Sequence, residues 1–316
     1  MSPITSPSAS VCIPVYNGER FLAQTIRSVL SQTYRDFELV LLDNASTDRT
    51  AEIVASFTDP RIRVERNATT VPQSANFNRA VDHCRTPLVK LVCADDLLSP
   101  RCLEFQVPPM VADPRIALVA SRRDMIDESG RVIAPRRGMG GLSGMHSKVD
   151  VVRQVVRNGG NPLGEPAGVM FRREDFHAVG GWQAEHSYLL DLDLWIRLLR
   201  RGEFFGLRES LAAFRIGSET VTASGDRPMY DAHRAFVHDL ATAPEFEVRP
   251  VDRLVGRVTR PAARLRRRTL YKVSAFAAQR SGDAAAWRVP LPRSADRDGS
   301  VHSGRRPEPT RKGSAT

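Results

Sequence analysis

The sequence is poor in the features that mark several classes of protein. Its 316 residues include only four cysteines, none in a Cys-x-x-Cys pair, so neither a disulfide scaffold nor a zinc-ribbon pattern is indicated. No apolar run approaches the roughly 20 residues that a helix needs to span a bilayer. The first ten residues lack the basic and apolar regions of a signal peptide. We therefore expect a cytoplasmic protein with reduced cysteines.

Lysine is also scarce, because 42 of the 46 basic residues are arginines. The formal net charge is +10, and residues 245–316, with 17 basic and 7 acidic residues, carry all of it. The rest of the chain is neutral, which gives no reason to expect a specific nucleic-acid partner. The arginine bias agrees with codon usage in a GC-rich genome.

Composition and periodicity divide the chain into four segments. Residues 1–9 are a Ser/Pro-rich lead-in that we expect to be disordered. Residues 10–225 alternate short apolar runs with amphipathic stretches, as a folded catalytic domain does. Residues 226–286 are expected to form a helical extension, and residues 287–316 a disordered basic tail.

The first half of the folded domain predicts alternating strands and helices. Strands are expected at residues 11–15, 37–42, 62–64 and 88–93, with helices at 19–32, 48–57 and 73–84 and another beginning at Ser99-Pro100. This order predicts an α/β fold with a doubly wound, mostly parallel sheet. The second half is more mixed, with strands expected at 116–120, 132–133 and 168–171 and helices at 147–157 and 191–200.

Polar side chains follow several of these strands at their carboxyl ends, where ligands bind in such sheets. They are Tyr16, Asn17, Asp43, Asp95 and Asp96. Adjacent carboxylates suit Mg²⁺ or Mn²⁺, which prefer oxygen ligands and bridge phosphates. Local alternatives stay open, since an Asp-Asp pair also caps helices and Asp43 could form an Asx turn. Asp191 lies at a predicted helix start, where a carboxylate also stabilises the helix by interacting with its dipole, so a purely structural role stays open.

Longer runs follow one another in the order and spacing of a known family, from residue 10 to about residue 222. These runs are Val11–Gly18, Ile26–Glu38, Leu42–Thr50, Asn76–Ala80, Lys90–Pro100, Val179–Trp182 and Leu190–Arg197. Together they resemble the family 2 glycosyltransferases, which are inverting enzymes of the GT-A fold. The GT-A fold joins a Rossmann-like nucleotide-binding half to a mixed acceptor half.

The resemblance implies a nucleotide diphosphate-sugar donor and assigns residues to it. The first turn of the family lines the base pocket, which corresponds here to Pro14, Tyr16 and Asn17, with Glu19 nearby. The acidic residue after the second strand, here Asp43, contacts the pyrimidine or ribose. The implied carrier is UDP or dTDP.

The resemblance also assigns the metal, the base and the acceptor side. Asp95, with Asp96 beside it, would bind ribose and the metal–diphosphate, so Mg²⁺ or Mn²⁺ is the implied cofactor, with Asp95 as its ligand. Asp191 would be the catalytic base. Gly181 and Trp182 would border the site of a glycan or lipid-linked acceptor.

Two positions depart from the family pattern. Many members have Asp two residues before the metal-binding Asp, where this chain has Cys93, and Glu before the base, where it has Leu190. Asp191 is then the only carboxylate at the usual position, with Asp193 as the fallback. The Gln-x-x-Arg-Trp motif of processive synthases is absent, because Gln154–Arg157 precedes Asn158 and lies before the base.

These features predict a non-processive inverting glycosyltransferase that moves one sugar to an acceptor hydroxyl, in cell-surface glycan or polysaccharide assembly. Cys93 and Leu190 favour one alternative, a catalytically degenerate member that binds nucleotide-sugars or scaffolds glycan assembly. A nucleotidyltransferase would need a Gly-rich phosphate loop near the N-terminus, and a dinucleotide oxidoreductase would need Gly-x-Gly-x-x-Gly after the first strand. The chain has neither.

The start of the basic tail shows two stripes at helical spacing. One contains Arg253, Arg257, Arg260, Arg264 and Arg267, and the other Val251, Leu254, Val255, Val258, Ala262 and Leu265. Such a pattern is typical of an interfacial helix, which predicts peripheral association with an anionic membrane surface at the inner face. Alternatives are a solvated helix packed on the catalytic domain, codon bias, or a nonspecific nucleic-acid patch. Pro261 is expected to break or kink the helix.

Overall fold

A computed structural model describes residues 8–158, 160–184, 189–217 and 226–278. The strands are β1 (Ala9–Val15), β2 (Phe37–Asp43), β3 (Ile62–Arg66), β4 (Leu88–Leu91), β5 (Leu97–Leu98), β6 (Ile116–Ile126), β7 (Val132–Arg137), β8 (Gly144–His146), β9 (Val169–Arg172) and β10 (Glu203–Arg215). The helices are α1 (Leu22–Leu30), α2 (Thr50–Ala55), α3 (Gln73–Asp82), α4 (Cys102–Ala112), α5 (Lys148–Asn158), α6 (Arg173–Ala178), α7 (Leu190–Leu199), α8 (Asp226–Thr242) and α9 (Pro250–Ala278). The predicted tail at 287–316 lies outside the described residues.

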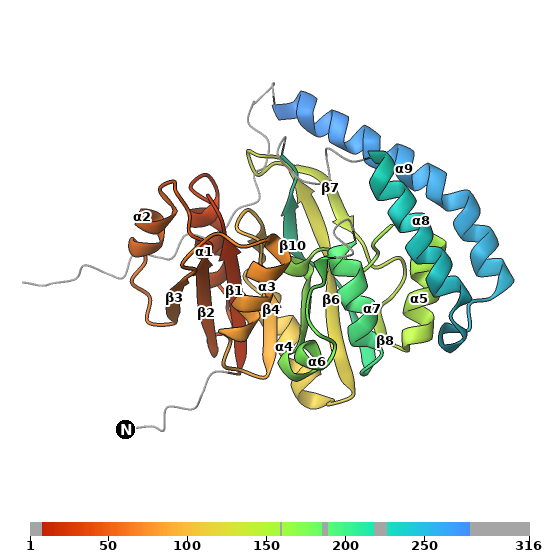
Figure 1. Ribbon diagram of the computed structural model, residues 1–316, viewed down its shortest axis with the longest axis horizontal. Helices are drawn as coiled ribbons and strands as arrows, with labels where there is room; N and C mark the ends of the chain where they lie inside the picture. Colours follow the sequence, from red (N-terminus) through yellow and green to blue (C-terminus); the bar gives the residue numbers. More distant parts are fainter. Residues whose placement is uncertain (1–7, 159, 185–188, 218–225, 279–316) are drawn as a thin grey trace, which may run out of the picture.

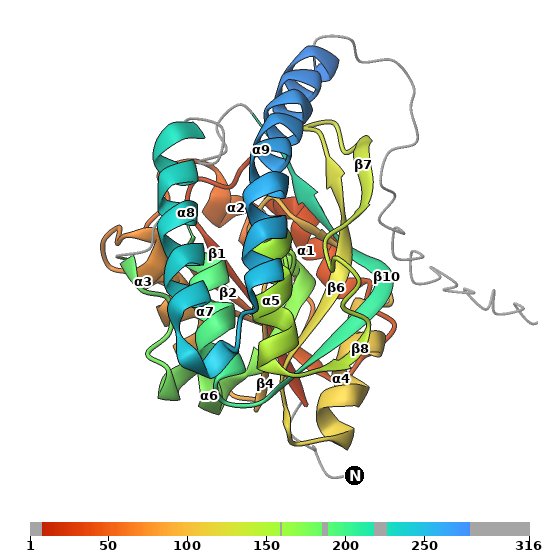
Figure 2. The same cartoon turned by 90° about the vertical axis from the view of Figure 1, so that its right-hand side faces the viewer.

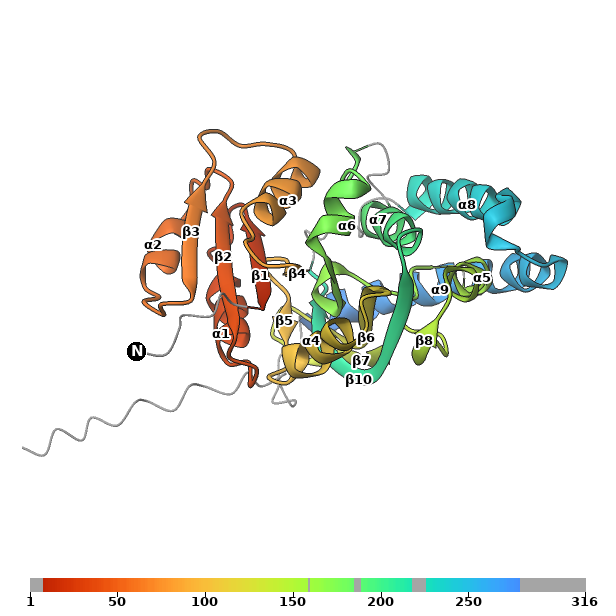
Figure 3. The same ribbon diagram turned by 90° about the horizontal axis from the view of Figure 1, so that it is seen from below.

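One sheet runs through the described part of the molecule in the order β3-β2-β1-β4-β9-β6-β10-β5. β1 to β4 are parallel, and β9 runs antiparallel to both β4 and β6. β10 is again parallel to β6, while β7 and β8 pair on as antiparallel strands. The predicted α/β fold with a mostly parallel sheet is confirmed, and the strand order reverses between β1 and β4 (Figure 3).

Helices cover both faces of the sheet because the parallel strands are apolar on both sides. Val11 and Ile13 of β1 pack in one core with α1 and α4. Cys12 of β1 packs in the other core with α3, α5 and α7. Successive side chains of a strand point to opposite faces, so a continuous apolar run buries both. The two cores hold the carboxyl ends of β1, β2 and β4 in place at one edge of the sheet (Figure 1).

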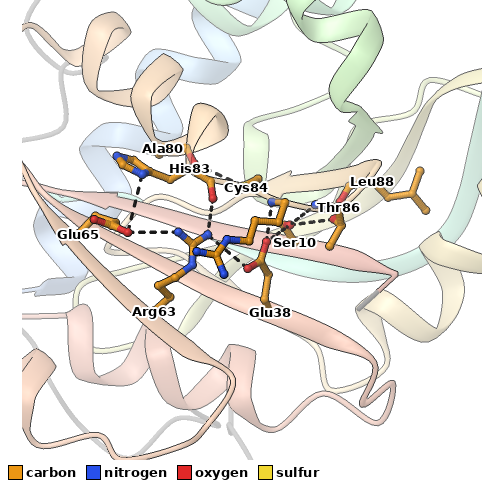
Figure 4. A network of polar contacts seen from close by, with 10 residues as sticks. Ser10, Glu38, Arg63, Glu65, Ala80, His83, Cys84, Thr86 and Leu88 are labelled. Atoms are coloured by element: carbon orange, nitrogen blue, oxygen red, sulfur yellow. Dashed lines mark hydrogen bonds and ion pairs between the residues drawn. The ribbon is translucent and has the colours of Figure 1, made fainter. Parts of the chain in front are cut away.

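The opposite, amino-terminal edge of β1 to β3 is held by a polar network (Figure 4). Glu38 accepts hydrogen bonds from the Ser10 hydroxyl at 2.6 Å and from the Arg85 backbone N–H at 2.7 Å. Arg63 of β3 pairs with Glu38 at 3.3 Å. Ser10 also hydrogen-bonds Thr86, at 2.8 Å, just before β4. These contacts join the starts of four strands and lie away from the ligand-binding edge.

The structure differs from the sequence-based expectations at three places. Ala9 belongs to β1, so the lead-in ends earlier than residue 9, and residues 1–7 lie outside the described part. α4 begins at Cys102, because the Ser99 carbonyl accepts the Cys102 N–H in a turn that precedes the helix. β10 was not expected as a strand. Arg208 and Glu209 interrupt its apolar pattern, and the register with β6 shifts between Leu207 and Ser210.

The expected break at Pro261 is also absent, since α9 is one continuous helix from Pro250 to Ala278. A proline inside a helix removes one N–H bond, here to the carbonyl of residue 257. Both Pro261 and Arg257 are exposed, so that carbonyl can be solvated. α9 lies against α5, with α8 on one side and β7 on the other (Figure 2). No helix in the described residues is long and apolar enough to cross a membrane.

Candidate active site

The turn after β1 is attached to the loop after β2. Asn17 has a φ of +49°, and its N–H donates to the Ser46 hydroxyl at 2.9 Å. The Asn17 side-chain oxygen accepts the Thr47 N–H at 2.9 Å. These bonds set Tyr16 at the carboxyl edge with 52% of its surface exposed. Tyr16 and Asn17 are therefore together at this edge, and the Tyr16 ring is free to contact a ligand.

Glu19 extends the same attachment. Its N–H donates to Asp48 at 2.9 Å, and its carboxylate accepts the Arg49 N–H at 3.3 Å. The Gly18 N–H donates to the Thr50 hydroxyl at 2.8 Å. Glu19 is exposed, so its carboxylate lies at the rim of the site rather than inside it.

Pro14 and Asp43 are buried beneath this rim. Pro14 pairs in register with Leu42, inside the sheet. Asp43 is 4% exposed, and its carboxylate accepts the Ser46 N–H at 2.9 Å and pairs with Arg66. Asp43 thus shapes the loop on which Asn17 rests, and its carboxylate is engaged by Ser46 and Arg66.

Asp95 and Asp96 follow β4 and lie at the reversal of strand order. Asp96 is fully buried; one carboxylate oxygen accepts the Arg215 N–H at 3.1 Å, and Oδ2 has no hydrogen-bond partner. Burial, and then the charge of Asp95, raise the pKa of Asp96 well above its usual range. Asp95 is half-buried, and burial raises its pKa as well. Two crowded carboxylates with an unpartnered oxygen are suited to a divalent cation.

Arg215, at the end of β10, positions this pair and was not predicted from the sequence. Its guanidinium donates to the Asp95 carbonyl at 2.9 Å and to the Asp127 and Glu128 carbonyls at 3.1 and 3.0 Å. It also lies over the Phe21 ring, 4.3 Å from the centroid. The only signal in the sequence was an arginine closing the apolar run 211–214.

Asp191 lies in the first turn of α7, half-buried. The Trp182 indole N–H donates to its Oδ1 at 3.3 Å. Burial, and then the charge of Glu165, raise the pKa of Asp191 to about 7. A carboxylate with such a pKa can accept a proton near neutral pH, as a general base must.

Glu165 is a further carboxylate at the site, beside Asp191, and sequence reasoning missed it. It is held by Arg123 of β6, whose guanidinium donates to it at 3.1 Å. Gly138 and Gly164 leave space for this guanidinium, because a Cβ would lie 2.4 Å and 3.0 Å from its Nη1. Glu165 precedes a 3₁₀ turn, Pro166–Gly168, in a loop whose sequence matched no motif.

The fallback residue Asp193 has a structural role in this arrangement. It pairs with Arg197 at 2.6 Å, and Arg197 donates to the Val179 and Gly181 carbonyls at 2.6 and 2.8 Å. Trp182 is only 2% exposed and packs against aromatic rings of the core, so it contacts Asp191 rather than presenting an open face. Gly181 is also buried.

Cys93 lies where the acidic residues converge. Burial raises its thiol pKa well above the usual range, and so do the charges of Asp96, Asp95, Asp191 and Glu165. Carboxylates from both halves of the sequence are therefore near enough to Cys93 to act on its thiol. No group of three or more histidine, cysteine or acidic side chains able to hold a metal is found among the described residues.

A doubly wound sheet with acidic residues at its reversal point places this protein among the α/β proteins that bind ligands at the carboxyl ends of their strands. The chain belongs to glycosyl transferase family 2, whose model matches residues 10–180. An uncharacterized protein of Mycobacterium tuberculosis is 32% identical over 225 residues, which are 68% of this chain and 69% of that protein. The Escherichia coli UDP-Glc:alpha-D-GlcNAc-diphosphoundecaprenol beta-1,3-glucosyltransferase WfgD is 28% identical over 131 residues, 40% of this chain and 51% of WfgD.

Solved structures share the fold. Residues 1–349 of Staphylococcus aureus TarS, in complex with UDP-GlcNAc, superpose with a TM-score of 0.57 at 16% identity, over 75% of this chain and 67% of that fragment. The mannosyltransferase PcManGT from Pyrobaculum calidifontis, in complex with GDP-Man and Mn²⁺, superposes with a TM-score of 0.58 at 18% identity, over 90% and 78% of the two chains. The protein is a glycosyltransferase of the GT-A fold.

Proposed function

We propose that this glycosyltransferase moves a single sugar from a nucleotide diphosphate-sugar to an acceptor hydroxyl, with inversion at the anomeric carbon. The observation that supports the proposal is the convergence of Asp95, Asp96 and Asp191 around Cys93. One pair is suited to a cation and a diphosphate, and the third carboxylate has a pKa of about 7. One edge of the sheet thus offers both carboxylates for the departing diphosphate and a carboxylate that can accept the proton.

In this mechanism Asp191 accepts the proton of the acceptor hydroxyl as its oxygen attacks the anomeric carbon. The bond from that carbon to the donor phosphate oxygen breaks on the opposite face, and a nucleoside diphosphate leaves. Trp182 holds Asp191 through its indole N–H. Since this hydrogen bond stabilises the charged carboxylate, it opposes the rise in the pKa of Asp191 that burial causes.

The donor would lie along the edge formed by Tyr16, Asn17 and the loop after β2. The exposed Tyr16 ring supports a stacking contact with the base. Asp95 and Asp96 would hold Mg²⁺ or Mn²⁺, which supplies charge neutralisation for the departing diphosphate. Arg215 keeps the two carboxylates at the reversal point through the Asp95 carbonyl and the Asp96 side chain.

We further propose a role in surface glycan or polysaccharide assembly on the cytoplasmic side of a membrane. WfgD, by its name, acts on a sugar linked to diphosphoundecaprenol. An acceptor of that kind, a sugar on a lipid diphosphate, would suit a chain whose charge excess lies entirely in residues 245–316.

The test is transfer by the purified full chain from a panel of UDP-, dTDP- and GDP-sugars, with and without Mn²⁺. We expect one donor class to be consumed, the product to carry the opposite anomeric configuration by NMR, and one sugar to be added per acceptor. Donor binding without turnover of any donor would support the degenerate alternative instead. Retention of configuration or repeated addition would contradict the mechanism.

A further inference from the structure

α9 has three distinct sides, and one of them packs against α5. Gly256 lies so close that an added Cβ would be 2.2 Å from the Val156 carbonyl oxygen. The Thr259 hydroxyl donates to the Arg157 carbonyl. Asp252 is fully buried and pairs with Arg157. The spacing of Asp252, Gly256 and Thr259 is that of one face of a helix, so the predicted packed helix is present on this side.

A second side is apolar and uncovered. It carries five large apolar side chains, here called the apolar stripe, whose exposed fractions run from 38% to 71%: Val251, Leu254, Val255, Val258 and Leu265. A surface helix normally directs its apolar face to the core and polar residues to water. A continuous row of exposed apolar side chains on one helix is typical of a surface that binds a partner or a membrane.

The third side is basic and borders a cleft of about 450 Å³ between α8 and α9. Arg253, Arg257 and Arg260 of α9 line it together with Arg234 of α8, and the only acidic lining residue is Asp231. Within the described residues, no hydrogen bond or ion pair engages the side chains of Arg234, Arg257 or Arg260. We call the part of the cleft lined by Arg234, Arg253, Arg257 and Arg260 the arginine cleft. An anion would find uncompensated donors there.

We propose that α9 docks the enzyme on an anionic lipid bilayer, with the apolar stripe at the boundary of headgroups and acyl chains and lipid phosphates in the arginine cleft. The argument rests on charge complementarity. Residues 250–278 contain eight basic residues and one acidic residue, Asp252, which is buried in ion pairs. An apolar stripe beside a basic one is what an interfacial helix requires.

Other occupants fit these surfaces less well. A second copy would bring the same arginines face to face, and like charges at an interface repel. Residues 279–316 hold eight basic and four acidic residues, so they too would approach the arginine cleft with the same sign of charge. A nucleic acid would satisfy the arginines but leave the apolar stripe in water.

The position of α9 connects this surface to the candidate active site. β7 pairs with the carboxyl end of β6, at the edge where β10 ends in Arg215. The carboxyl-terminal half of α9 rises past β7 at that edge (Figure 1). A bilayer docked on α9 would therefore lie beside the site, where a lipid-linked acceptor is presented. This inference rests on the proposed function only for the identity of the acceptor.

The test is cosedimentation of the full-length chain with vesicles of phosphatidylcholine, with or without about 30% phosphatidylglycerol. Leu254→Glu/Val258→Glu tests the apolar stripe, and Val64→Glu/Val111→Glu, at positions of similar exposure, is its control. Arg257→Glu/Arg260→Glu tests the arginine cleft, with Arg35→Glu/Arg85→Glu as the charge-matched control on exposed residues. Each basic residue near an anionic surface contributes roughly a fivefold factor, so the cleft variant should bind at least about 30-fold more weakly.

We expect wild type to bind only the anionic vesicles, the binding to fall with added salt, and both controls to bind like wild type. Absent binding, equal binding to neutral vesicles, or binding unchanged in the stripe variant would overturn the proposal. So would a stripe variant that converts a dimer into a monomer. Vesicle binding is measured without donor or acceptor, so it can fail while transfer to a water-soluble acceptor is intact. In the same way, transfer can fail while vesicle binding is intact, so the two proposals are tested separately.

Discussion

Replacing Asp191 by asparagine should lower the catalytic rate without lowering the stability of the protein. The amide keeps the shape of the side chain but cannot accept a proton, and removal of a general base typically lowers the rate by about 10²–10⁴. Donor affinity should stay within a few-fold, because Asp191 lies on α7 and the donor edge is built from the ends of β1, β2 and β4. The direct readout is kcat with saturating donor and acceptor.

The same substitution should change stability in a pH-dependent way. The pKa of Asp191 is raised to about 7 in the folded protein, mainly by burial and then by Glu165, against about 4 in an unfolded chain. The folded state therefore binds the extra proton between about pH 4 and pH 7, and ionisation of Asp191 costs folding free energy as the pH rises through that window. Three pKa units set an upper limit of about 4 kcal/mol.

Asp191→Asn should accordingly be more stable than wild type at pH 8 and similar to it at pH 4. Urea unfolding at the two pH values measures the difference, and Asp82→Asn, at an exposed carboxylate, is the control. A variant that keeps near-normal turnover would refute the assignment of the base. A stability difference that is the same at both pH values would refute the burial argument.

Three further changes test the surroundings of the base and the donor edge. Glu165→Gln removes the charge that adds to the effect of burial on the pKa of Asp191 and leaves Arg123 without a charged partner, so the acidic limb of the kcat–pH profile should move to lower pH. Glu174→Gln, at an exposed position of α6, should leave that limb in place. Asp95→Ala should weaken nucleoside diphosphate binding mainly with Mn²⁺ present; calorimetric affinity that is metal-independent in wild type would contradict a metal site at Asp95. Arg215→Met removes the donors to three backbone carbonyls and should lower the free energy of unfolding by roughly 3 kcal/mol, which thermal unfolding would show as a lower melting temperature. Arg101→Met, at an exposed ion pair, is the control and should change the melting temperature little.

Local sequence was enough for the first half of the fold. Residues 11–15 of β1 and residues 39–42 of β2 are apolar at consecutive positions, as is typical of strands buried on both faces, and in β4 only Lys90 interrupts the apolar run. Because parallel strands end at one edge, the residues that follow them can be grouped from the sequence alone. The same reasoning failed for β10, whose charged centre hides a strand that is specified by its neighbours β6 and β5.

The arrangement of the site itself was decided by tertiary structure. Asp95 and Asp191 lie far apart in the sequence, and only the packing of α7 against the sheet brings them near Cys93. Glu165 and Arg215 belong to no motif. Their roles arise because burial makes an unpaired charge costly, so each must meet a partner from a distant segment.

The sequence by itself determined the family, the alternation of strands and helices in the first half, and the two stripes of α9, since all three are patterns of neighbouring residues. Tertiary structure alone decided which side of α9 is covered: the side with Gly256 packs against α5, and the apolar stripe is left exposed. It also decided the protonation behaviour of Asp191, since a pKa depends on the solvent and charges around the group. Neither quantity can be read from neighbours in the chain, because both are set by residues that only folding brings together.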